Sequence, residues 1–256
     1  MAATTINNVI KELNAIVDHS INTSNRMAYF AVLYKRVTET VAQKITEGYF
    51  DDGPRMEKLD VVFANRYLNA HYAYTSGKAC SASWQFAFDS TKLWKPMVLH
   101  HLLLGMNAHI SLDLGIAAAT VSPGNTINNI HNDFSKINAL LIAMINEVKL
   151  QLFSMWPASK LIAKLNMGEM ENSIAGFSME IARDAAWQVA LAYAPLTGLT
   201  AQTDYINARD KAVNAFGNHI LNPGAWSTTV MYVLRLFEVG TTASKIKKLS
   251  EKIDTA

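Results

Sequence analysis

The sequence has little cysteine, glycine, proline or charge. Cys80 is the single cysteine among 256 residues, so no intramolecular disulfide and no multi-thiolate metal site can form. Glycine and proline number only 12 and 6, which argues against a collagen-like repeat, a disordered chain or a turn-rich β sandwich. Half of the residues are hydrophobic and 17% are charged. This composition predicts an all-α fold, with a single domain over residues 1–256 built as a multi-helix bundle.

Charge and motifs limit the expected partners. The formal net charge is +2, from 23 basic and 21 acidic residues, and no long run of one sign marks a nucleic-acid groove. The first residues lack a basic start followed by an apolar core, so we expect no signal peptide and a cytoplasmic location. Serine-hydrolase elbows, phosphate-binding glycine loops and paired C-x-x-C motifs are absent from the sequence. The expected partner is a small-molecule substrate, and a homo-oligomer is compatible with the sequence.

An apolar run at residues 97–120 is the longest in the chain, and no Lys, Arg or Glu occurs between Lys95 and Lys136. Its length would suit a membrane span, but Asn107, His109 and Asp113 interrupt its middle. The run therefore predicts a buried central helix of a bundle rather than a membrane span.

Hydrophobic periodicity predicts further helices along the rest of the chain. Gly105 and Gly115 are unfavourable inside a helix, and they predict close approach of a neighbouring helix or a ligand. Because the loop at residues 122–125 is short, the helix after it should run antiparallel to the central one, bringing His131 near Asp113. The other helices are expected at residues 5–17, 25–47, 56–75, 127–153, 174–193, 205–221, 226–238 and 244–253, and a short helix is expected between residues 77 and 94.

Polar residues in the apolar run form the candidate site. His109 and Asp113 are one helical turn apart, and His101 lies two turns earlier, within about 80° of the same face. Buried polar groups must be paired with a partner or bind a ligand. The spacing therefore predicts three groups that face one interior region.

The helix expected at residues 56–75 contributes further candidates. Asp60 and His71 share a face with aromatic residues, and this face is expected to look toward His109. The structural alternative is that the aromatic residues only pack in the core and that Asp60, near the helix start, is a capping residue. Arg66 is expected to pair with a buried carboxylate or an anionic ligand. Farther along, Arg183 and Trp187 lie one turn apart, which suits a cation–π contact, a pocket wall or core packing.

Two chemical hypotheses and one structural alternative follow from these residues. In the first, a divalent metal, zinc or iron, assists a hydrolysis, and its ligands are His101, His109, Asp113 and His131. Asp60 completes the metal's ligand shell or acts as the base. Arg66 or Asn107 orients the substrate. In the second, Asp113 orients His109 as the acid–base group of a metal-free lyase, isomerase or cyclase. In the third, the pair is a packing hydrogen bond of a ligand-binding or scaffold protein.

The segment HLLLGMNAHISLDLG at residues 101–115 resembles a bacterial and fungal family catalogued only as a domain of unknown function. The resemblance continues at residues 61–68, 83–84, 133–138, 183–187 and 209–213, and it implies a single helical domain without an assigned activity. His109 and Asp113 are also similar to the H-x-x-x-D pair of the all-helical zinc-dependent phospholipase C and nuclease class. The chain lacks that class's N-terminal Trp ligand and a second H-x-x-x-E pair, so the resemblance implies one or two metals at most.

Overall fold

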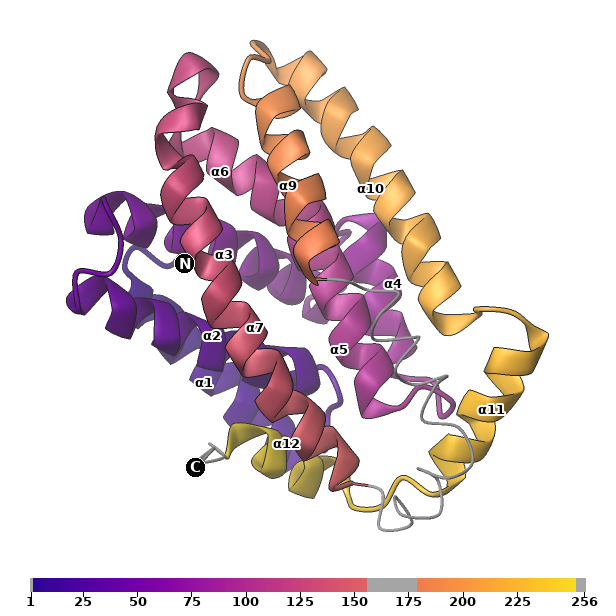
Figure 1. Ribbon diagram of the computed structural model, residues 1–256. Helices are drawn as coiled ribbons and strands as arrows, with labels where there is room; N and C mark the ends of the chain where they lie inside the picture. The colour runs from indigo at the N-terminus through magenta and orange to yellow at the C-terminus, as the bar shows by residue number, and fades with distance from the viewer. Residues whose placement is uncertain (1, 156–178, 252–256) are drawn as a thin grey trace.

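The computed structural model describes residues 2–155 and 179–251, and the regular elements in these ranges are all helical (Figure 1). The prediction of an all-α bundle is confirmed. Predicted boundaries within residues 156–178 and 252–256 lie outside the described residues. The α-helices are α1 (Ile6–Thr23), α2 (Ala28–Thr46), α3 (Gly53–Thr75), α4 (Ala82–Ser90), α5 (Val98–Met106), α6 (Gly115–Val121), α7 (His131–Phe153), α9 (Met179–Tyr193), α10 (Leu199–Leu221), α11 (Ala225–Leu236) and α12 (Thr242–Ser250).

The central helix runs without a break from Val98 to Val121, as α5, a π-helical segment η1 (Asn107–Leu114) and α6. Elements α2, α3, α4, α9 and α10 pack around it. By length and composition alone this helix is long and apolar enough to cross a membrane, but 89% of its most apolar window is buried inside the protein. That burial agrees with the prediction of a central core helix.

After the central helix the chain turns through η2 (Gly124–Ile130) and returns antiparallel along it as α7 (Figure 1). This direction was predicted from the short connection. The predicted helix start at residue 127 was wrong, because residues 124–130 form a 3₁₀ helix and α7 begins at His131. Asn125, Asn128 and Asn129 explain the difference, since Asn side chains compete for the backbone hydrogen bonds of a regular α-helix.

Two glycines allow neighbouring elements to lie against the central helix. A Cβ at Gly105 would lie 2.4 Å from the Phe30 ring, and one at Gly115 would lie 2.3 Å from the backbone oxygen of Ala186 in α9. Real Cβ atoms do not approach other atoms so closely. The predicted close approach is therefore confirmed for both glycines, and helices α2 and α9 are the neighbours.

Buried ion pairs attach the C-terminal helices to this core. The Glu238 carboxylate, after α11, accepts a hydrogen bond from the backbone N–H of Val98 at 2.9 Å and one from Lys245 Nζ at 2.8 Å. Arg235 also donates to Glu238 at 2.9 Å. Glu238 thereby satisfies a free N–H at the start of the central helix, where a negative charge is favourable.

Candidate functional site

An elongated cavity lies between α2, α3, the central helix, α7 and α9, with a volume of about 120 Å³. Most of its wall consists of apolar side chains. The polar or charged residues on the wall are Tyr34, Asp60, His109, Lys149 and Arg183. An apolar chamber with a few polar groups is the usual form of a small-molecule site.

His109 lies on the π-helical segment and is 3% exposed. Its ring stacks on Phe63 with centroids 3.5 Å apart, and the Tyr34 ring meets it edge-on at 4.3 Å. Neither ring nitrogen has a hydrogen-bond partner among the described residues. Burial lowers the pKa of His109 against the opposing effect of Asp113, so the imidazole is neutral near pH 7. A buried neutral imidazole with free nitrogens can accept a proton or bind a ligand.

Asp113 lies beside His109 and is fixed by donors from two other helices. Arg66 Nε of α3 donates to Oδ1 at 2.6 Å, and Trp84 Nε1 of α4 donates to Oδ2 at 2.8 Å. The same Oδ2 lies 3.7 Å from His109 Nδ1. Burial alone would raise the pKa of Asp113, but Arg66, His109 and Trp84 together hold it below its usual value. The charged carboxylate favours a proton on Nδ1 of His109, which leaves Nε2 as the basic nitrogen. The predicted pairing of Arg66 with a buried carboxylate is confirmed.

We expect Asp113→Asn to destabilise the protein by about 2–4 kcal/mol at pH 7, because the amide would turn an NH₂ toward Arg66 or Trp84 and leave a buried donor unpaired. The folded-state pKa of Asp113 is lowered, so its stabilisation is present at neutral pH and is lost as the pH falls through that value. Urea unfolding between pH 7 and pH 3 should show the difference between the two proteins shrinking. The exposed Asp204→Asn in α10 is the control, and an equal effect there would contradict the assignment.

Asp60 of α3 lies on the wall of the same cavity and is 7% exposed. Its Oδ2 has no hydrogen-bond partner among the described residues. Burial, with a smaller effect of Glu57, raises the pKa of Asp60 to about 8. Asp60 is therefore a neutral carboxylic acid near pH 7, able to donate a proton. Phe63, one turn later on α3, is the residue that stacks on His109, as expected for a face of this helix that looks toward His109.

Asp113 and Arg66 are not among the residues that line this cavity, and three other predicted site residues do not line it either. His101 Nδ1 lies 3.3 Å from the Ser90 hydroxyl, His131 is exposed with its ring 4.5 Å from that of Trp187, and Asn107 donates to the Val213 carbonyl at 2.9 Å. His101 lies eight residues before His109, which is about 12 Å along the helix axis, and its ring packs against Tyr29 with centroids 5.6 Å apart. His101 therefore reaches a different region of the core from His109.

The donor set does not fit a metal centre in the part of the chain that the structure describes. No group of three or more His, Cys, Asp or Glu side chains is placed there to hold a metal ion. His109 and Asp60 offer unengaged donors, whereas Asp113 is occupied by Arg66 and Trp84. A protein site for zinc usually requires at least three side-chain ligands.

Sequence reasoning missed several residues of the site. The contacts of Trp84 with Asp113 and of Tyr34 with His109 were not predicted, because they join segments that are distant in the sequence. Arg183 lies 4.5 Å over the Phe134 ring and donates to the Phe134 carbonyl, rather than contacting Trp187 as one prediction had it. Arg183 is buried, as the core-packing alternative has it, and it is among the residues that line the cavity.

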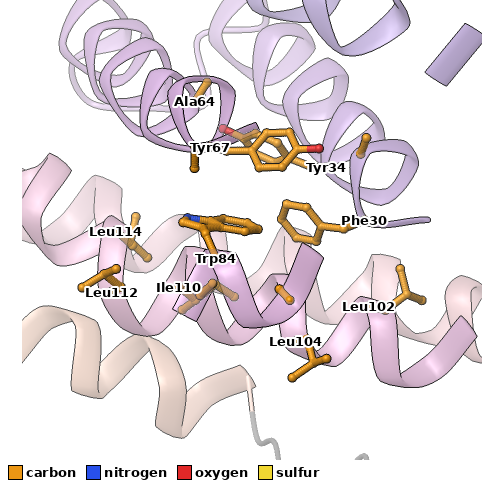
Figure 2. Close-up of a cluster of buried hydrophobic side chains, with 14 of the residues drawn as sticks. Phe30, Tyr34, Ala64, Tyr67, Trp84, Leu102, Leu104, Ile110, Leu112 and Leu114 are labelled. Atoms are coloured by element: carbon orange, nitrogen blue, oxygen red, sulfur yellow. The ribbon is translucent and has the colours of Figure 1, made fainter. Parts of the chain in front are cut away.

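The aromatic layer around the site joins α2, α3 and α4 to the central helix. Figure 2 shows the rings of Phe30 and Trp84 between Tyr34 and Tyr67 on one side and the central helix on the other. Leu104 and Leu112 point away from this layer. The packed rings place Trp84 Nε1 at Asp113 and support the His109 ring.

Comparison with known proteins gives a family but no activity. No curated protein and no solved structure matches the chain. A family model described as "Family of unknown function (DUF5995)" matches residues 6–223. This range holds the cavity, His109, Asp113 and Asp60, and it ends before α11 and α12. Because the match covers most of the chain, the protein belongs to this family of unknown function, DUF5995.

Proposed function

We propose that the protein is a metal-free enzyme that moves a proton within a small, partly apolar molecule held in the cavity, as an isomerase or lyase does. The observation that carries this proposal is the buried His109 ring, which faces an apolar chamber with Nε2 unpartnered among the described residues and with Nδ1 3.7 Å from Asp113 Oδ2. Asp113 orients the His109 ring, which acts as the general base. The neutral Asp60 carboxyl group, on the wall of the same cavity, acts as the general acid. Two titratable groups with displaced pKa values in one cavity are typical of acid–base sites.

The proposed step is a balanced proton transfer. His109 Nε2 takes a proton from a carbon next to a carbonyl group, and Asp60 gives its proton to the carbonyl oxygen, so that an enol forms. Asp60 then recovers the oxygen proton, and the imidazolium returns a proton to the same or another carbon. The charged Asp113 stabilises the imidazolium, and Arg66 keeps Asp113 ionised.

Deuterium exchange tests this function. The unbranched ketones 2-octanone and 2-decanone, which suit the apolar wall, are incubated in D₂O with the parent protein, and deuterium next to the carbonyl is measured by mass spectrometry. We expect exchange that falls at least a hundredfold in His109→Gln, because general acid–base catalysis contributes 10²–10⁴-fold. His131→Gln, at an exposed histidine outside the cavity, is the matched control and should exchange like the parent.

Binding of these ketones is measured beside the exchange by titration calorimetry. A ketone that binds the parent protein but gains no more deuterium than with His109→Gln would overturn the catalytic proposal and favour a ligand-binding protein. Failure of both ketones to bind would also count against it.

Metal-assisted hydrolysis remains a prediction from the sequence that elemental analysis can test. Because the described residues offer no group of three suitable ligands, we expect well below one equivalent of zinc or iron in untagged protein. The same measurement is made on His109→Ala and Asp113→Ala, with circular dichroism to show that each folds. Near-stoichiometric metal that is lost from both folded variants would replace the proposed proton transfer by metal chemistry.

A further inference from the structure

The cavity is a channel that follows the central helix and α7. Its wall includes Leu99 and Leu114 on the central helix, which are separated by roughly 20 Å at 1.5 Å per residue. On α7 it includes Ile137 and Leu152, which are separated by a similar length. A volume of about 120 Å³ over such a length is narrow. A thin, extended apolar molecule fits this shape better than a compact one.

Two cations lie at opposite ends of the channel. Arg183 contacts the ring and the carbonyl of Phe134, one turn before Ile137, so it lies at the end near the start of α7. Lys149 lies near the other end of α7, next to Val148, and is only half-buried. The charge at the Arg183 end is enclosed by protein, whereas the Lys149 ammonium can reach water.

Arg183 is 3% exposed, and no carboxylate lies within ion-pair distance of its guanidinium among the described residues. Its Nε has no hydrogen-bond partner among these residues. Burial lowers the pKa of Arg183 to about 10, so the group still carries its charge near pH 7. A buried, unpaired guanidinium is costly unless an anion binds it, and its planar donors match a carboxylate.

We infer that the channel binds a long-chain carboxylic acid with a carbonyl group along its chain, with the carboxylate on Arg183 and the chain along the apolar wall past His109. This inference rests on the proposed function, since it assigns the substrate class of the same site. The narrow bore selects an unbranched chain, and the enclosed cation selects an acid over a neutral lipid. The neutral state of Asp60 avoids repulsion of the bound acid.

Calorimetric titration of lipid-stripped protein with octanoate, dodecanoate and hexadecanoate tests the inference, with hexadecanol as the neutral comparison. We expect affinity to rise about fourfold for each added methylene until the channel is filled. Arg183→Met should weaken binding of the acids ten- to hundredfold and leave hexadecanol unchanged. Lys247→Met, at an exposed lysine of α12 outside the cavity, is the control and should change little.

Equal affinity of the parent for hexadecanol and hexadecanoate, no rise of affinity with chain length, or a larger loss of acid binding in Lys149→Met than in Arg183→Met would each overturn the inference. These parent-protein comparisons decide the matter even where Arg183→Met does not fold. The two proposals can fail separately. Tight acid binding without deuterium exchange in any ketone would support the ligand class and contradict the proton transfer. Deuterium exchange without any acid binding would support the proton transfer and contradict the ligand class.

Discussion

Replacing Gly115 by alanine should lower the free energy of unfolding by up to about 2 kcal/mol. The new Cβ would lie 2.3 Å from the Ala186 backbone oxygen and 2.7 Å from Val189 Cβ, so helix α9 would have to move away from the central helix. Overpacking of this kind costs about 1–3 kcal/mol and sometimes more. Alanine would gain about 1 kcal/mol of helix propensity, which the clash must exceed. Urea unfolding followed by circular dichroism measures the net effect.

Gly217→Ala in α10 is the matched control, because Gly217 is also a buried helical glycine. A Cβ there would meet Phe86, Leu104 and Asn107 at 3.4–3.5 Å, which is near ordinary van der Waals contact. We expect this variant to be unchanged or stabilised by up to about 1 kcal/mol. Equal destabilisation of both variants would contradict the close contact between α9 and the central helix.

Asp60→Asn should change how stability depends on pH. In the unfolded chain Asp60 ionises near pH 3.8, whereas in the folded protein it keeps its proton until about pH 8. Unfolding therefore releases a proton between these values, and the stability of the parent protein falls as the pH rises through this window. The asparagine variant lacks this loss, so its stability relative to the parent should rise by about 1.4 kcal/mol per pH unit between pH 5 and pH 8.

The measurement is urea unfolding of both proteins at several pH values, with Asp18→Asn, at an exposed aspartate of α1, as the control. The Asp18 variant should follow the parent at every pH. A constant difference between the Asp60 variant and the parent would mean that Asp60 is already ionised in the folded protein. A bound cation would have that effect, so this result would also argue against Asp60 as a proton donor.

Much of the fold could be predicted from the sequence because it depends on local pattern. The apolar run at residues 97–120 predicted the central helix, and the short loop after it predicted the antiparallel return of α7. Gly105 and Gly115 predicted close helix packing, since glycine inside a helix is otherwise unfavourable. Arg66 could be expected to find a buried carboxylate, because a charged residue on an aromatic-rich helix face needs a partner.

The rest of the site depends on geometry that residue spacing does not carry. His101 and His109 lie eight residues apart, a rise of about 12 Å along the helix, whereas the prediction of one shared region considered only the angle between their faces. Contacts such as Trp84 with Asp113 join segments far apart in the chain and arise only from packing. The cavity, and the position of Arg183 at its end, likewise follow from how α7 and α9 lie against the core.

The position of Glu238 has a consequence for where this domain ends. Glu238 and its partner Lys245 lie beyond residue 223, where the family match stops, yet Glu238 accepts the N–H of Val98 at the start of the central helix. A fragment cut at the family boundary would leave that N–H and its helix dipole without their acceptor. The unit that folds is therefore longer than the unit that is recognisable by sequence, and fragments designed for expression should retain α11 and α12.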